Sequence, residues 1–273
     1  MNPAFSLDGQ VAVVTGALGK LGPVWVEALV EAGAQVVALD LPGAQPSPAF
    51  TAVADAAAGR EGGGVARFDC DITSRDSINE ACRLLTAAHG LPSILVNNAG
   101  VDQPPDSGGN RSAIEDLAIT QFRRMVEVNL LGTFQVTQVI GGAMAAAGRG
   151  SIVNIGSLYA SVSPDQRFYD HLPGDLPFLK SPAYGASKAA VVNMTKYFST
   201  LWGLKGVRVN TLSPGGVRGG QDAQFTAKYG SRVPLGRMAE PGDLKGPLVF
   251  LASTAASYVT GHELRVDGGF TAW

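Results

Sequence analysis

The chain has 273 residues, of which 45% are hydrophobic and 16% charged, and its formal net charge is −2. These values are typical of a globular protein with a large core, and the absence of a basic cluster argues against a nucleic-acid partner. No apolar stretch approaches the ~20 residues of a membrane span, and the N-terminal residues lack the pattern of a signal peptide.

Cysteine and histidine are both sparse. Two cysteines, Cys70 and Cys82, make neither a disulfide framework nor a zinc cluster. The three histidines are too scattered to suggest a metal site. Both thiols fit a reduced compartment, so we expect a cytoplasmic protein with no bound metal and no membrane partner.

Short β-branched runs alternate with longer Ala/Leu-rich segments along the whole chain. The former predict strands at 11–15, 35–40, 65–69, 93–99, 151–157, 207–213 and 262–267. The latter predict helices near 21–33, 74–89, 113–147, 183–204 and 240–252. Strands that are apolar on both faces and separated by helices indicate a parallel sheet covered on both sides. We therefore predict a single α/β domain, 1–273, with a Rossmann-like doubly wound sheet of about seven strands.

A glycine-rich turn, TGALGKLG (15–22), follows the first predicted strand. Its G-x-x-G-x-x-G spacing differs from the G-x-G-x-x-G of dinucleotide-binding proteins, and a tight turn without a ligand is the alternative. A phosphate placed there would meet unpaired N–H groups and the positive end of a helix dipole. The turn is therefore a candidate phosphate-binding site.

Asp40 ends the second predicted strand. A carboxylate at this place accepts hydrogen bonds from the two ribose hydroxyls of an adenosine and repels a 2′-phosphate. It therefore favours NAD over NADP, although Lys20 in the glycine-rich turn could help to bind a 2′-phosphate. Asp71, after the third predicted strand, could bond the adenine amino group or could cap a turn, and both interpretations stay open.

Tyr184 and Lys188 lie in SPAYGASKAAVV, four residues apart, so they share one face of a predicted helix. A phenol with a pKa of about 10 is a poor base at neutral pH, but a neighbouring cation favours the phenolate. The pair is a plausible proton relay for an alcohol or a carbonyl. An unrelated surface tyrosine and lysine is the alternative.

Together these motifs resemble the short-chain dehydrogenase/reductase family, compact single-domain type, over nearly the whole chain. The matches follow the family's order: TGALGKLG (15–22), Asp71, NNAG (97–100), Asn129 in VNLLGTF, Ser157 in SIVNIGS, Tyr184-x-x-x-Lys188, PGG (214–216) and TGHELRVDGG (260–269). Each motif alone is weak, whereas the ordered set is specific.

The resemblance implies four catalytic residues. Tyr184 would be the general acid/base, and Lys188 would bond the nicotinamide ribose and lower the pKa of Tyr184. Ser157 would hold the substrate oxygen, and Asn129 would order a water that links Lys188 to solvent. Asn97 is expected to be mainly structural. The expected cofactor-binding residues are Gly16, Leu18, Gly19, Lys20, Leu21, Gly22, Asp40, Asp71, Ile72, Asn98, Ala99, Gly100, Tyr184, Lys188, Pro214, Gly215 and Val217.

The sequence departs from the family pattern in three places, one of which is the absence of the threonine often found soon after PG, since the sequence here runs PGGVRGGQ (214–221). Lys20 stands at the usual middle glycine, and this spacing is more typical of the larger branch that acts on nucleotide sugars. Those proteins carry a C-terminal substrate domain, whereas this chain ends soon after VDGG. The interval between Ser157 and Tyr184 is also longer than usual. We expect the extra segment, 158–182, and a second insertion, 217–232, to border the substrate pocket.

Both insertions are rich in hydrogen-bonding groups and cations, which is unlike a lipid or steroid pocket. The candidate substrate residues are Tyr159, Arg167, His171 and Arg218, with exposure to solvent as the alternative. We expect an NAD-dependent oxidoreductase that interconverts a secondary alcohol and a ketone on a small polar substrate such as a sugar, sugar acid or polyol. The alternatives are an epimerase or dehydratase that retains NAD, and an NADP-dependent reductase of a hydrophobic ketone or 3-oxoacyl substrate.

The helices predicted at 113–147 and 183–204 have broad apolar faces. The resemblance implies that they form a four-helix interface between subunits, and that the C-terminal GFTAW forms a second interface. We expect a homotetramer, with a dimer as the alternative. Trp273 should be buried, since an exposed terminal tryptophan is unfavourable.

Overall fold

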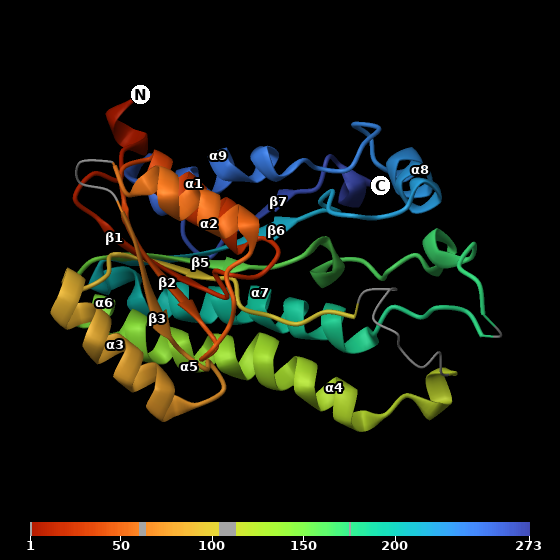
Figure 1. The fold of residues 1–273 in the computed structure, drawn as a ribbon, viewed down its shortest axis with the longest axis horizontal. Coiled ribbons are helices and arrows are strands. Elements are labelled where there is room, and N and C mark those ends of the chain that lie inside the picture. The colour runs from red at the N-terminus through yellow and green to blue at the C-terminus, as the bar shows by residue number, and fades with distance from the viewer. Residues whose placement is uncertain (1, 60–63, 104–112, 175) are drawn as a thin grey trace.

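Seven parallel strands form one sheet in the order β3-β2-β1-β4-β5-β6-β7 (Figure 1). The computed structural model describes residues 2–59, 64–103, 113–174 and 176–273. The strands are β1 (Val11–Thr15), β2 (Gln35–Asp40), β3 (Gly64–Asp69), β4 (Ile94–Asn97), β5 (Gly150–Ile155), β6 (Val207–Pro214) and β7 (Glu263–Val266). The strand order reverses between β1 and β4, and ligands of such sheets bind at the carboxyl edge near this point. The predicted fold class is confirmed.

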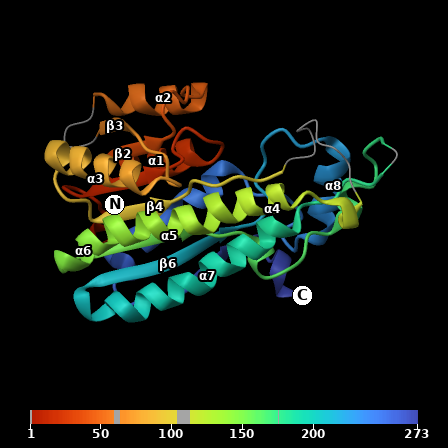
Figure 2. The same ribbon diagram turned by 90° about the horizontal axis from the view of Figure 1, so that it is seen from below.

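Helices cover both faces of the sheet (Figures 1 and 2). One face carries α1 (Gly22–Glu31), α2 (Pro48–Ala57) and α9 (Lys245–Ala252). The other carries α3 (Arg75–His89), α4 (Ile119–Val126), α5 (Thr133–Val136), α6 (Gly142–Ala146) and α7 (Pro182–Trp202). The remaining α-helix of the described chain, α8 (Ala223–Arg232), lies beyond the carboxyl edge of the sheet, beside the segment before α7. Within the described residues, no helix combines the length and apolarity that a membrane crossing needs.

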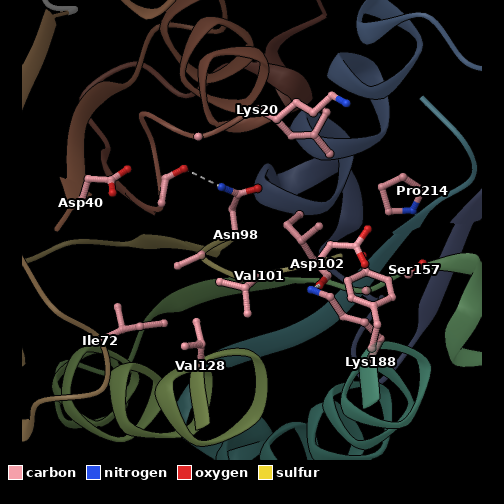
Figure 3. A pocket seen from close by; sticks show the side chains of 18 of the residues that line it. Lys20, Asp40, Ile72, Asn98, Val101, Asp102, Val128, Ser157, Lys188 and Pro214 are labelled. Atoms are coloured by element: carbon pink, nitrogen blue, oxygen red, sulfur yellow. Dashed lines mark hydrogen bonds between the residues drawn. The ribbon is translucent and has the colours of Figure 1, made fainter. Parts of the chain in front are cut away.

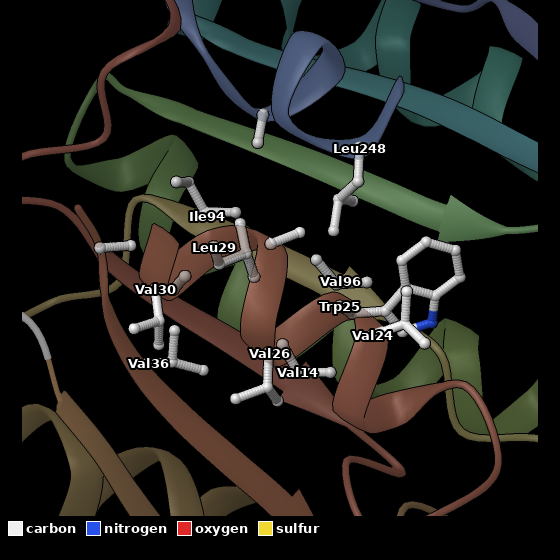
Figure 4. Close-up of a cluster of buried hydrophobic side chains, with 14 of the residues drawn as sticks. Val14, Val24, Trp25, Val26, Leu29, Val30, Val36, Ile94, Val96 and Leu248 are labelled. Atoms are coloured by element: carbon white, nitrogen blue, oxygen red, sulfur yellow. The ribbon is translucent and has the colours of Figure 1, made fainter. Parts of the chain in front are cut away.

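The alternation of side chains along the strands creates a core on each face. Val14 of β1 packs under α1 with Trp25 and Leu29 (Figure 4), whereas its neighbour Val13 packs on the opposite face with α3 and α6. Trp25 is fully buried. Fully burying an aliphatic side chain such as Val14 or Leu29 contributes about 1.5–3 kcal/mol, so these two cores fix the strands whose carboxyl ends form the site.

The helix predicted over 113–147 differs in detail. The described chain makes a 3₁₀ turn at Ile114–Asp116, and the regular helix begins only at Ile119. It then contains two π-helical stretches, Glu127–Gly132 and Thr137–Gly141, between α4, α5 and α6. The hydroxyls of Thr133 and Thr137 each donate to the carbonyl four residues earlier, a contact that bends helices. Such π-bulges occur often at functional sites.

Helix α8 was not predicted, because its sequence belongs to the insertion 217–232. It begins after Asp222, whose carboxylate accepts from the N–H of Phe225 at 2.8 Å. Its apolar side packs on the other insertion, 158–182, through rings of both segments. Of that insertion, residue 175 lies outside the described residues.

Candidate active site

A cleft of about 440 Å³ opens at the carboxyl edge of the sheet (Figure 3). The residues that end or follow β1 to β6 contribute to its lining. The predicted residues in the lining are Gly16, Gly19, Lys20, Leu21, Asp40, Asp71, Ile72, Asn98, Ala99, Gly100, Ser157, Tyr184, Lys188, Pro214, Gly215 and Val217. Three of the predicted catalytic and cofactor-binding residues, Leu18, Gly22 and Asn129, are not part of the lining, and neither are the four predicted substrate residues.

The glycine-rich turn fits closely against the chain that follows β4. Gly16 has a φ of +62°, and a Cβ there would lie 2.6 Å from the Cα of Ala99. Only glycine satisfies both conditions. A Cβ on Gly22 would lie 2.2 Å from the carbonyl oxygen of Ala17. Gly22 therefore shapes the turn by close packing, and its predicted contact with a cofactor stays a prediction.

Asp40 links the end of β2 to the glycine-rich turn. Its Oδ2 accepts from the N–H of Leu18 at 2.8 Å, and its Oδ1 accepts from the N–H of Leu41 at 2.9 Å. The N–H of Leu18 is thus directed at Asp40, and its side chain is buried in the core that includes α1, so its contact with a cofactor stays a prediction. The carboxylate itself lines the cleft, and each oxygen keeps a lone pair for a further donor.

Lys20 lies away from Asp40. A Cβ on Gly219, in the segment after β6, would lie 2.5 Å from Cε of Lys20. Figure 3 shows Lys20 and Asp40 on separate sides of the cleft. The one cation of the turn is therefore not placed beside the carboxylate at the end of β2.

Asp71 serves the turn after β3. Its Oδ1 accepts from the N–H and the hydroxyl of Thr73, at 2.9 and 2.8 Å. This is the capping role that the sequence left open. Asp71 and Ile72 also line the cleft, so a contact with adenine stays a prediction.

The NNAG motif fixes the chain between β4 and the cleft. Asn98 donates to the carbonyls of Thr15 and Gly16, at 3.0 and 2.8 Å, and its Oδ1 accepts from the indole of Trp25. Asn97 points the other way and donates to Asn154 at 2.8 Å. Asn98 therefore positions the glycine-rich turn from behind, while Asn97 joins β4 to β5.

Ser157, Tyr184 and Lys188 meet at one end of the cleft. Ser157 follows β5, and α7 begins just before Tyr184, where the hydroxyl of Ser181 accepts from the N–H of Ala183. Nζ of Lys188 lies 5.9 Å from the ring centroid of Tyr184 and donates to the carbonyl of Ile155 at 2.7 Å. The predicted sharing of one helix face thus places both groups in the cleft.

Burial governs the titration of this pair. Burial raises the pKa of Tyr184 well above its usual value and the charge of Asp102 adds to the rise, whereas a hydrogen bond with Ser157 opposes it. Burial lowers the pKa of Lys188 to about 8, against the effect of Asp102. The sequence suggested that Lys188 lowers the pKa of Tyr184. In the protein alone the pKa of Tyr184 is raised, mainly by burial and then by the charge of Asp102, and the effect of Lys188 on it stays a prediction.

Asn129 lies behind the cleft, in the first π-helical stretch. Its side chain accepts from the N–H of Val101 at 2.7 Å and donates to the carbonyl of Val101 at 2.9 Å and to Ser187 at 3.2 Å. A Cβ on Gly100 would lie 3.1 Å from Oδ1 of Asn129 and 3.7 Å from Nζ of Lys188. Asn129 therefore holds the chain after β4 beside Lys188, and its role in ordering a water stays a prediction.

One of the four predicted substrate residues lies beside Tyr184. The ring of Tyr159 meets that of Tyr184 edge-on, with centroids 6.5 Å apart. The other three have local partners outside the cleft lining: Arg167 pairs with Asp165, His171 with Asp222 and Arg218 with Glu240. Their polar ends are held by nearby carboxylates, so the structure does not bring them to Tyr184.

Sequence reasoning missed an ion pair in the same region. Asp102 lines the cleft and pairs with Lys180 at 2.5 Å, and Nζ of Lys180 lies 5.6 Å from the ring centroid of Tyr184. The weak available signals were an acidic residue just after NNAG and a lysine just before Tyr184. No cluster of metal-ligating side chains occurs within the described residues.

The described residues fit a dinucleotide. The glycine-rich turn offers close backbone approach, Asp40 offers acceptors for hydroxyl groups, and the proton-active residues lie at the opposite end of the cleft (Figure 3). Fold and site together define a nicotinamide-dependent oxidoreductase with a Rossmann-like sheet.

Comparisons with known proteins identify the family. A family model described as enoyl-(acyl carrier protein) reductase matches residues 16–271. D-threitol dehydrogenase of Mycolicibacterium smegmatis is 35% identical over 98% of this chain and 95% of its own, and galactitol 2-dehydrogenase (L-tagatose-forming) of Cereibacter sphaeroides is 35% identical over 98% of each.

Solved structures agree. A short-chain dehydrogenase from Leptospira borgpetersenii with bound NAD+ superposes with a TM-score of 0.83 at 32% identity, covering 99% of this chain and 96% of that one. A gluconate 5-dehydrogenase from Burkholderia cenocepacia in complex with NADP and tartrate gives 0.82 at 29% identity, covering 99% and 98%. The chain belongs to the short-chain dehydrogenase/reductase family and is an oxidoreductase that acts on CH–OH groups.

Proposed function

We propose that this chain is an NAD-dependent dehydrogenase that interconverts a secondary alcohol and a ketone on a small, hydroxyl-rich substrate such as a polyol, sugar or sugar acid. The observation that carries the proposal is the meeting of Ser157, Tyr184 and Lys188 at one end of a cleft whose other end holds Asp40. The threitol and galactitol dehydrogenases among the relatives support the substrate class.

The chain's own residues would handle the proton and the substrate oxygen. A bound nicotinamide dinucleotide supplies the hydride acceptor or donor, and its oxidised ring adds a positive charge. Burial keeps Tyr184 protonated, so its hydroxyl is ready to donate to a ketone oxygen. In the oxidation of an alcohol, Tyr184 would first release its proton to solvent, and the phenolate would then accept the alcohol proton while Ser157 donates a hydrogen bond to the same oxygen.

Asp40 supports NAD as the preferred cofactor. Its carboxylate is anchored by two backbone N–H groups and faces the cleft, so a 2′-phosphate would meet a fixed negative charge. Lys20 lies beside Gly219 and not beside Asp40, which leaves that charge uncompensated by the turn. We further propose a homotetramer in a cytoplasmic setting.

The test is the variant Tyr184→Phe, with Tyr258→Phe as the control because Tyr258 is fully exposed and does not line the cleft. Removing the phenolic proton should lower kcat by about 10²–10⁴-fold, while binding of NADH, measured by fluorescence, stays close to wild type. NADH formation would be followed with polyols, sugars, sugar acids and hydrophobic alcohols.

Several outcomes would contradict the proposal. If Tyr184→Phe had the kcat of the wild type, Tyr184 would be excluded as the group that exchanges a proton with the substrate. Conversion of substrate without net NADH formation would indicate an epimerase or dehydratase instead. Turnover of hydrophobic alcohols alone would refute the substrate class.

A further inference from the structure

The ion pair of Asp102 and Lys180 borders the reacting end of the cleft. Asp102 comes shortly after β4, and Lys180 comes two residues before α7. Nζ of Lys180 donates to Oδ2 of Asp102 at 2.5 Å and to the carbonyl of Gln103 at 3.3 Å, and it lies 5.6 Å from the ring centroid of Tyr184. The pair is therefore next to the group that exchanges a proton with the substrate.

The two partners are unequally exposed. The Lys180 side chain is 7% exposed and that of Asp102 is 40% exposed. Lys180 thus spends two of its three donors inside the protein, whereas Asp102 lines the cleft. Figure 3 shows Asp102 at the same end of the cleft as Ser157 and Lys188. A substrate that reaches Tyr184 therefore meets the carboxylate and not the ammonium group.

The charge of Asp102 also acts on the relay. Its negative charge raises the pKa of both Tyr184 and Lys188. Such an effect requires a short distance through a poorly solvated medium. The carboxylate consequently acts on any charge that a substrate brings to the same place.

The inserted segment 158–182 holds Lys180 in this position. The backbone N–H of Lys180 donates to the side chain of Gln166 at 3.1 Å, so two distant parts of the insertion are joined. Three other cations of the two insertions are already paired: Arg167 with Asp165, Arg218 with Glu240 and Lys228 with Asp170. None of these three belongs to the lining of the cleft.

We propose that Asp102, oriented by Lys180, is a substrate-binding residue that selects neutral polyhydroxy compounds over sugar acids. An ionised carboxylate is purely an acceptor, so it binds the hydroxyl next to the reacting carbon and repels a substrate carboxylate. The inference rests on the proposed function and narrows its substrate class to polyols and their ketoses. It also gives the insertion 158–182 a role, which is to supply the counter-ion that fixes Asp102.

The experiment compares galactitol with galactonate, which have the same carbon chain and differ at one end. We would measure kcat and KM with NAD for the wild type, for Asp102→Asn and for the double variant Asp102→Asn/Lys180→Met. The double variant is needed because Asp102→Asn leaves Lys180 buried without a counter-charge. Glu31→Gln is the matched control, since it removes an exposed carboxylate that pairs with Lys245 far from the cleft.

The wild type should prefer galactitol. Both Asp102 variants should lose at least about tenfold in kcat/KM for galactitol, mainly through KM, because a hydrogen bond to a charged group is lost. The ratio of galactonate to galactitol turnover should rise, while the affinity for NADH and the behaviour of Glu31→Gln stay at wild-type values.

Three results would overturn the inference. The first is a wild type that prefers galactonate to galactitol. In that case the Tyr184→Phe comparison would still test whether the chain is a dehydrogenase that uses Tyr184. An unchanged substrate ratio in the folded double variant would exclude Asp102 as the selecting group. A wild type that oxidises neither compound, but another class of alcohol, would remove both this inference and the proposed substrate class.

Discussion

Asp40 illustrates how one side chain can serve structure and recognition together. Its two oxygens accept from the N–H groups of Leu18 and Leu41, which fixes the carboxylate relative to the glycine-rich turn. A fixed acceptor loses little conformational freedom when it binds a ligand. The same anchoring prevents the carboxylate from turning away from a phosphate.

We predict that Asp40→Ser reduces the preference for NAD. The serine keeps a small polar group but removes the charge that repels a 2′-phosphate, so the ratio of kcat/KM for NAD to that for NADP should fall by about tenfold or more. The control is Asp69→Ser, because Asp69 is the register neighbour of Asp40 at the end of β3 and does not line the cleft. A wild type that uses NADP as well as NAD would contradict the prediction.

The residues that could be predicted from the sequence are those with short-range patterns. Tyr184 and Lys188 are one helical turn apart, so local geometry gives their shared helix face, and Asp40 ends a strand, whereas their place in a common cleft followed from the resemblance to the family. Asp102 and Lys180 are 78 residues apart, and their pairing depends on the path of an insertion that no periodicity specifies. Arg167, His171 and Arg218 pair with carboxylates outside the cleft lining for the same reason: the chemistry of a polar side chain does not reveal which carboxylate it will meet, and their contact with a substrate stays a prediction.

At the scale of elements, the positions of the strands could be predicted from the sequence, whereas the structure of the two insertions could not. β1 and β2 have the predicted bounds, because burial on both faces leaves a continuous apolar run. Helix α8 has its apolar side covered by Phe168 and Tyr169 of the other insertion. The insertions 158–182 and 217–232 each lack a complete hydrophobic pattern. Helix α8 could therefore not be recognised from its own sequence without knowing that 158–182 packs against it.

We predict that Phe168→Ala loosens the contact between α8 and the insertion. Phe168 is buried and meets the rings of Phe225, Tyr229 and Phe270. Its removal should lower the free energy of unfolding by about 3–5 kcal/mol and raise KM for the substrate, since Lys180 belongs to the same insertion.

Thermal unfolding and steady-state kinetics would measure the two effects. Tyr258→Ala serves as the control, because Tyr258 is fully exposed and its truncation should change neither quantity. A Phe168→Ala protein with the melting temperature and KM of the wild type would show that the two insertions are independent.

At the scale of the whole molecule, several large apolar side chains are exposed on the surface of a single chain. Leu201 of α7 is 49% exposed and Leu204, just beyond it, is fully exposed, while Leu131 lies exposed in the neighbouring π-helical stretch. Trp273 is 70% exposed, although its indole donates to the carbonyl of Arg232 at 3.3 Å. The sequence predicted a buried C-terminus, and within one chain it is not buried. A partner subunit would have to cover it.

The predicted homotetramer can therefore be tested at its two expected interfaces separately. Leu201→Glu places a charge on the exposed side of α7 and should split the tetramer into dimers, because burying an unpaired charge at an interface is costly.

Deleting residues 270–273 should disrupt the second interface. Trp273→Ala leaves the buried Phe270 in place, so this variant distinguishes a lost interface from a loss of folding. The mass in solution, measured by light scattering, would report each change, with Leu84→Glu on the exposed side of α3 as the matched control. A wild type with the mass of one chain in solution would contradict the predicted homotetramer.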